Sequence, residues 1–173
     1  MACHAQNVTP TTPNEIPDAR GGDRQLGMAS HAPTVVGRSA GDAPTVFVSG
    51  WHSPVEQEIE RILARGKVPL VLAAARSPEK MRVAPSWRER IGENRGLIVS
   101  PFESGHRLTS RSAEARNRWI LGVCPRVVVP HAAPGGALHA LLMETLAAPG
   151  APQISVFAHA DHAELLSGGA RQM

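Results

Sequence analysis

Four segments of this sequence combine residue types that bind phosphate, and each follows a short apolar run. They are Ser49-Gly50-Trp51-His52-Ser53, Ala75-Arg76-Ser77, the stretch from Ser100 onward, and His131-Ala132-Ala133-Pro134-Gly135-Gly136. Glycine lets the backbone approach an anion, and the first turn of a following helix offers free N–H groups. Ser49-Gly50 and Gly135-Gly136 therefore predict a phosphate site. The alternative is that both glycine pairs only form tight turns between a strand and a helix.

The densest run of basic residues lies between His106 and Arg118 and contains Arg107, Arg111, Arg116 and Arg118. Guanidinium groups pair well with phosphate oxygens, although a solvated helix face is the alternative. On a helix, Arg116 and Arg118 lie about 200° apart. At most one of them is therefore expected to face a given ligand, while the other braces a loop or a partner.

Histidine and aspartate residues near the end of the chain offer possible metal ligands. They are His131, His139, His159, Asp161 and His162. Their spacings predict no compact metal site. Cys124 has no paired base, so a buried thiol is expected. We therefore predict no catalytic residue, no metal and no cofactor.

Composition limits the class of protein. The chain has 173 residues, a formal charge of +3 and no tyrosine, which favours one domain with an aliphatic core. Cys3 and Cys124 lie far apart and form no C-x-x-C pair, which indicates reduced thiols rather than a disulfide scaffold. No apolar stretch is long enough to span a bilayer, and no signal pattern opens the sequence. These features predict a soluble cytoplasmic protein without a membrane partner.

The elements that position these residues begin at Thr45. Short apolar runs alternate there with amphipathic segments, which predicts repeated β-α units. Five strands are expected, at residues 45–48, 69–73, 97–99, 126–129 and 154–157. The predicted fold is a single Rossmann-like three-layer α/β domain over residues 44–160, with a mostly parallel sheet of about five strands. Residues 1–43 are expected to be disordered, apart from a possible short strand at 34–38, and residues 161–173 to form a flexible tail.

Helix starts can be predicted from capping residues. Ser53, Pro54 and Glu56 form a capping box with a first-turn proline, and Gly66 ends that helix. A second box, Ser86 with Glu89, predicts a short helix. Ser112 is expected to cap a third helix. A fourth is predicted over residues 137–148, where leucines recur at helical spacing.

The order of these motifs resembles the DNA-processing protein A (DprA/Smf) family. That family follows a strand with Ser-Gly-x-Ala-x-Gly-x-Asp, and Ser49, Gly50 and Glu56 fall on its serine, glycine and acidic positions. Its Arg-Asn-Arg helix start matches residues 116–118, and its valine strand with Ser-Gly-Ala/Ser-Leu matches residues 127–138. The family's first β-α unit is shortened here.

The resemblance implies a protein that binds single-stranded DNA, forms a homodimer and loads the RecA recombinase. Trp51 and Phe102 would stack on bases, with core closure as the alternative for each, and arginines would hold the phosphates. The predicted site for DNA and phosphate comprises Ser49, Gly50, Trp51, His52, Arg76, Arg107, Arg111, Arg116, Asn117, Arg118, Gly135 and Gly136.

Two other classes remain open. The LOG phosphoribohydrolases carry Pro-Gly-Gly-x-Gly-Thr-x-x-Glu, and Pro134-Gly135-Gly136 fits its start. The catalytic glutamate falls on Leu142, which favours a nucleotide or phosphorylated cofactor binder without hydrolytic activity over an enzyme. The third class is a structural module, because a shortened first unit leaves a sheet edge that invites pairing.

Overall fold

The computed structural model describes residues 34–36, 45–79 and 81–173. The expectation of disorder for residues 1–43 therefore lies outside the described residues, except at strand β1 (Thr34–Val36). Within these ranges, no helix is long and apolar enough to cross a membrane.

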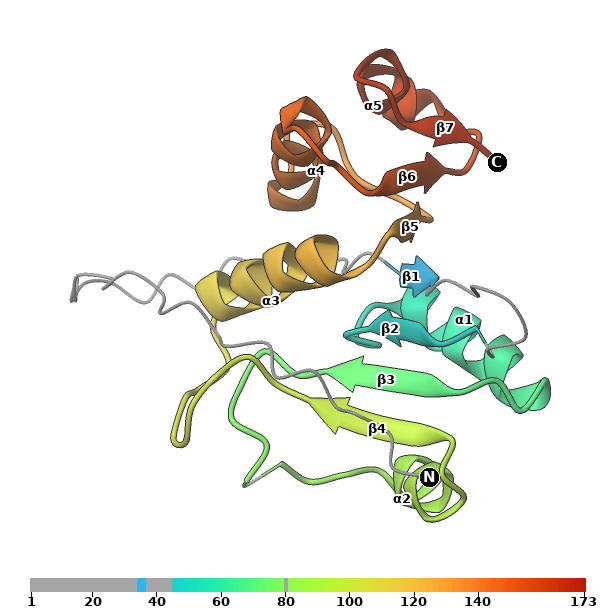
Figure 1. Ribbon diagram of the computed structural model, residues 1–173, viewed down its shortest axis with the longest axis vertical. Coiled ribbons are helices and arrows are strands. Elements are labelled where there is room, and N and C mark those ends of the chain that lie inside the picture. Colours follow the sequence, from blue (N-terminus) through green and yellow to red (C-terminus); the bar gives the residue numbers. More distant parts are fainter. Residues whose placement is uncertain (1–33, 37–44, 80) are drawn as a thin grey trace, which may run out of the picture.

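The chain folds as a mixed α/β protein (Figure 1). After β1 come β2 (Phe47–Ser49), α1 (Pro54–Arg65), β3 (Leu70–Ala73), α2 (Pro85–Gly92), β4 (Gly96–Val99), α3 (Ser110–Val123), β5 (Arg126–Val129), α4 (Ala137–Ala147), β6 (Gln153–Val156), the 3-10 turn η1 (Ala160–His162), α5 (Ala163–Ser167) and β7 (Arg171–Gln172). Each of the five predicted strands corresponds to one of β2 to β6.

The sheet has seven strands in the order β4-β3-β2-β1-β5-β6-β7, rather than the five that we expected. Two blocks, β4-β3-β2 and β5-β6-β7, are parallel within themselves. Between them, β1 pairs antiparallel with β2 on one side and β5 on the other. The prediction missed β7 because its two residues carry no apolar run.

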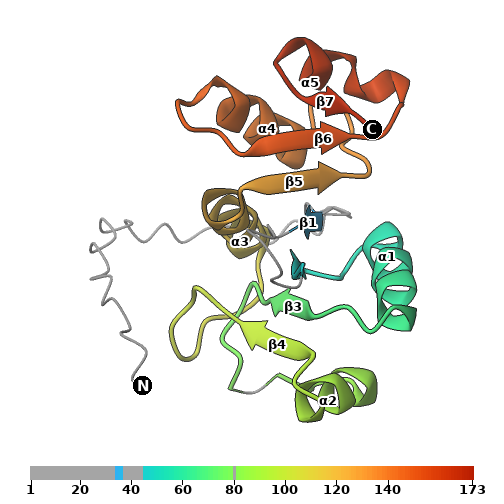
Figure 2. The same ribbon diagram turned by 45° about the vertical axis from the view of Figure 1, so that its right-hand side comes forward.

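Helices cover both faces of this sheet and give it two core clusters. Helices α1 and α2 lie on one side of the sheet, and α3 lies on the other (Figure 2). Leu70 of β3 packs with Trp51 and Trp87 on the first side, while Ala73 joins the larger cluster under α3, α4 and α5. Successive residues of β3 therefore point to opposite faces, as a strand requires.

The last residues are folded into the domain. We expected 161–173 to be a flexible tail, but they contain α5 and β7, and β7 pairs in parallel with β6. Leu165 of α5 is fully buried in the larger core cluster. A short apolar segment that docks on a neighbouring strand gives too weak a periodic signal to be recognised in the sequence.

The capping residues were predicted with mixed success. The Ser53 and Glu56 capping box at α1 is confirmed, and the helix ends at Gly66. Helix α2 begins two residues earlier than the Ser86 cap predicted, after Ala84, and has no side-chain cap. Helix α3 is capped by Thr109, whose hydroxyl accepts from the Ser112 N–H, so Ser112 is the third helical residue and not the cap.

Candidate functional site

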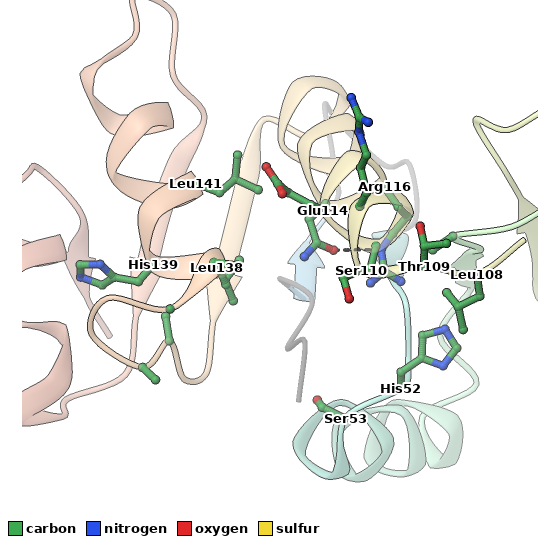
Figure 3. Close-up of a pocket in the computed structure, with 18 of the residues that line it drawn as sticks. His52, Ser53, Leu108, Thr109, Ser110, Glu114, Arg116, Leu138, His139 and Leu141 are labelled. Atoms are coloured by element: carbon green, nitrogen blue, oxygen red, sulfur yellow. Dashed lines mark hydrogen bonds between the residues drawn. The ribbon is translucent and has the colours of Figure 1, made fainter. Parts of the chain in front are cut away.

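A pocket of about 860 Å³ lies where the loops after β2, β3 and β5 meet the first turns of α1, α3 and α4. It sits between the two parallel blocks of the sheet. Figure 3 shows His52 and Ser53 at the start of α1, residues 108–110 at the start of α3, and Leu138 and Leu141 on α4. The lining residues are His52, Ser53, Pro54, Ala75, Leu108, Thr109, Ser110, Arg111, Ala113, Glu114, Arg116, Asn117, Ala132, Ala133, Gly136, Ala137, Leu138, His139 and Leu141.

Arg116 is the fully buried cation of this site. Its Nη1 donates to the carbonyl oxygen of Ala73 at 3.2 Å, and its Nε donates to Asn117 Oδ1 at 2.9 Å. The guanidinium lies so close to Gly50 that a Cβ built there would be 1.8 Å from Nη1. Gly50 therefore serves the site by leaving room for Arg116.

A second buried charge, Glu56, holds the loop after β2. Its carboxylate accepts from Ser49 Oγ, from the Ser53 N–H at 2.9 Å and from the His52 N–H at 3.3 Å. The side chain is 1% exposed. The sequence predicted Glu56 as part of a capping box. In the structure, Glu56 also holds the backbone at His52 in place through the His52 N–H.

The two buried charges set the electrostatics of the pocket. Burial lowers the pKa of Arg116, and the negative charge of Glu56 opposes that shift. Burial and the positive charge of Arg116 lower the pKa of His52, and Arg76 adds to this while Glu56 opposes it. These effects together favour the neutral form of the His52 imidazole.

The first turn of α4 forms the opposite wall. Gly135 has a positive φ of 70°, and Gly136 occupies the N-cap position without any side-chain hydrogen bond to the turn. A Cβ at Gly136 would lie 3.0 Å from the Ala133 carbonyl oxygen. The leading N–H groups of a helix have no acceptor within it, and the helix dipole makes this end positive. The wall at Ala137 and Leu138 therefore suits an anion.

The arginines of α3 diverge as their spacing predicted. Arg116 is buried beneath the pocket, whereas Arg118 forms a bidentate ion pair with Glu144 of α4 at 2.6 and 3.0 Å. Arg118 thus braces α3 against α4 rather than facing the pocket. Arg111 lines the pocket and is exposed, and Arg107 is exposed in the loop before α3.

The two aromatic residues proposed for base stacking lie differently. Trp51 is 5% exposed and donates from Nε1 to the Val71 carbonyl oxygen at 2.9 Å. Its indole closes the core cluster with Leu70 and Trp87, so the expectation that it stacks on a base is corrected. Phe102 stacks on His106 with ring centroids 4.4 Å apart.

The pocket has a different acidic residue from the one that a LOG-type mechanism requires. Leu142 is fully buried in the core, and Glu144 is held by Arg118. Glu114 lines the pocket, and its carboxylate lies 3.5 Å from Arg118. Glu114 belongs to no sequence motif that would have marked it as a pocket residue.

The burial of Cys124 limits the reactivity of its thiol. Cys124 is buried, as predicted, and burial raises the pKa of its thiol to about 11. It is therefore not a nucleophile at neutral pH.

The histidine and aspartate set, for which the spacings predicted no compact site, is partly brought together: His131, His159 and Asp161 cluster at the ends of β5 and β6. His139 is buried on α4, outside that cluster.

The pocket is therefore built from a bare helix N-terminus, a buried arginine and a histidine, with leucine side chains from the loop before α3 and from α4 around them. Comparisons of the chain with protein-family models, with curated proteins and with solved structures find no match.

Proposed function

We propose that this protein binds a mononucleotide or a similarly small phosphorylated ligand on a Rossmann-like domain, without hydrolysing it. The observation that carries the proposal is the position of the pocket, between two parallel blocks where the strand order changes direction. In open α/β sheets, ligands bind at this point, beyond the carboxyl ends of the strands.

The chemistry of the walls supports a phosphorylated ligand. The uncapped first turn of α4 offers N–H groups and a positive dipole end to a phosphate. Arg111 at the pocket adds an exposed cation. Leu108, Leu138 and Leu141 supply apolar surface for a ring. The volume of about 860 Å³ falls within the range of about 300–1,000 Å³ that is typical of small-molecule sites.

Binding without hydrolysis follows from the carboxylates. A phosphoribohydrolase of the LOG type needs an acid/base group on α4, and Leu142 occupies that position in the core. Glu144, two residues on, is committed to Arg118 on the outside of the helix. The remaining pocket acid, Glu114, stands on α3 beside Arg118.

A thermal-shift titration with adenine and guanine mononucleotides tests the proposal. A ligand at 100 times its dissociation constant stabilises the native state by about 2.7 kcal/mol, which raises the melting temperature measurably. Ala137→Asp is expected to weaken binding at least tenfold, because its carboxylate repels phosphate at the wall. The same acid in the first turn of α4 favours the helix, so the fold is retained.

Ala140→Asp is the matched control, because Ala140 is exposed on the same helix and does not line the pocket. It is expected to bind nucleotide like the wild type. If no nucleotide raises the melting temperature of the wild type, the proposal fails. Equal nucleotide affinities of the two aspartate variants would show that the phosphate does not bind at the first turn of α4.

Single-stranded DNA binding is the second candidate, and the exposure of Arg107 and Arg111 beside the pocket favours it. The homodimer and the RecA partner implied by the DprA/Smf resemblance belong to this candidate. It predicts salt-dependent binding to oligo-dT that Arg107→Ala and Arg111→Ala weaken, measured by fluorescence anisotropy. Arg65→Ala, at the far end of α1, should leave binding unchanged. An anisotropy that stays flat at low salt would exclude this candidate.

A further inference from the structure

Three side chains with metal-binding atoms meet at the carboxyl ends of β5 and β6. His131 follows β5, while His159 and Asp161 follow β6. Their ligand atoms all lie within 4.8 Å of one another. This cluster is outside the residues that line the pocket, but His131 adjoins Ala132, which does line it.

The two distances from the Asp161 carboxylate to the histidine nitrogens match the edges of a coordination tetrahedron. Asp161 Oδ2 lies 3.3 Å from His131 Nε2 and 3.5 Å from His159 Nδ1. Nitrogen and oxygen ligands lie about 2.0–2.2 Å from zinc, so two ligands of a tetrahedral site are separated by about 3.3–3.5 Å. A charge-assisted N–H···O bond is shorter, at about 2.7–2.9 Å. The distances therefore suit a shared ion better than two direct ion pairs.

A buried histidine joins the two loops that carry the cluster. His162 Nε2 accepts from the Ala132 N–H at 3.1 Å, which requires its proton to be on Nδ1, beside the Phe157 carbonyl oxygen at 2.8 Å. His162 is fully buried and links residue 132, next to His131, with residue 157, close to His159. The spacing between the ligands is thus fixed by the fold.

The tautomer of His159 also suits metal binding. Its Nδ1 accepts a hydrogen bond from the Asp161 N–H at 3.2 Å, so this nitrogen carries a lone pair and no proton in the neutral ring. A cation at Nδ1 would replace that hydrogen bond. The three side chains keep 37%, 53% and 38% of their surface exposed, which leaves room for a water molecule or an exogenous ligand.

We propose that His131, His159 and Asp161 bind one divalent transition-metal ion, with Zn²⁺ as the representative ion. Two imidazoles and one carboxylate form a donor set for zinc and its neighbours, whereas Mg²⁺ and Ca²⁺ prefer oxygen ligands. Three protein ligands leave the fourth position open, as in zinc sites that bind a further molecule. This site is independent of nucleotide binding.

Zinc titration of the full chain, prepared without a histidine tag and stripped with chelator, tests the site. Competition against a chromophoric chelator should show one equivalent of Zn²⁺ bound per chain in a Cys3→Ser background, which removes a competing thiol. His131→Ala and Asp161→Asn should each weaken binding roughly tenfold or more, by loss of a ligand. His106→Ala is the matched control, because His106 stacks on Phe102 outside the cluster. It should bind zinc like the parent.

Melting curves make the result decisive. At the same Zn²⁺ concentration, the melting temperature should rise by more in the parent and in His106→Ala than in Asp161→Asn, because stabilisation of the native state grows with its affinity for the ion. If His131→Ala does not fold, His131→Gln replaces it, since an amide preserves polarity and binds zinc poorly. Absence of binding at micromolar Zn²⁺, or equal affinity in the His131→Gln/Asp161→Asn double variant and the parent, would overturn the proposal.

Discussion

Replacing Gly50 with alanine is expected to lower the free energy of unfolding by about 2–4 kcal/mol. The new Cβ would lie 1.8 Å from Arg116 Nη1 and 2.6 Å from its Cζ, so the guanidinium has to move. Moving it breaks the hydrogen bonds to the Ala73 carbonyl and to Asn117 Oδ1, and the side chain is only 1% exposed to solvent that could replace them. Chemical denaturation followed by circular dichroism measures the effect.

A double-mutant cycle isolates this cause. In an Arg116→Met background the clash is relieved, and Gly50→Ala is expected to cost less than about 1 kcal/mol. Gly122→Ala in α3 is the matched control. A Cβ there meets no atom within 4 Å, so alanine should stabilise the helix by about 0.5–1 kcal/mol. An equal loss for Gly50→Ala in both backgrounds would mean that Arg116 is not the reason for the glycine.

Removing the carboxylate of Glu56 is expected to have the second large effect. Glu56→Ala removes the carboxylate that accepts from the Ser53 and His52 N–H groups and from the Ser49 hydroxyl, and should cost about 3–4 kcal/mol. The loop after β2 would lose its anchor, so nucleotide affinity should fall as well. Urea denaturation and the thermal-shift titration measure these two consequences.

Glu56→Gln separates the hydrogen bonds from the charge. The amide oxygen can still accept from the Ser53 N–H, and its NH₂ group can donate to Ser49 Oγ, so the loss should be about half that of alanine. The remaining loss of stability reflects the missing negative charge, which favours the charged form of Arg116. Glu58→Ala, on the exposed face of α1 beside Arg61, should change stability little. If glutamine were as damaging as alanine, the charge would dominate over the hydrogen bonds.

Several parts of the fold that depend on local chemistry were predictable, although the caps of α2 and α3 were not. The Ser53 and Glu56 cap is a pattern of four consecutive positions, and the divergence of Arg116 and Arg118 follows from helical geometry alone. Both were recognised because nothing distant decides them. The same applies to the five strands, whose apolar runs are visible in the sequence.

The parts that depend on which strands are neighbours were not predictable. Trp51 can be buried because its indole N–H donates to the carbonyl oxygen of Val71. Val71 lies on β3, the strand next to β2. His131 and Asp161 meet because β5 and β6 lie side by side, and their spacing along the chain carries no trace of that. Gly50 was predicted to leave room for a bound anion. In the structure it leaves room for the guanidinium of Arg116, a cation of the protein itself.

The antiparallel strand β1 also affects how the domain reaches its native state. Val35 pairs with Val48, close in sequence, and with Val127, far along the chain. Among the described strands, β1 comes first along the chain and pairs with a distant partner, and such non-local pairing slows folding. The strands within each half of the sheet have partners closer in sequence, so these pairings can form before β1 joins the two halves. We therefore expect the crevice between the two halves to form late in folding, when β1 pairs with β5.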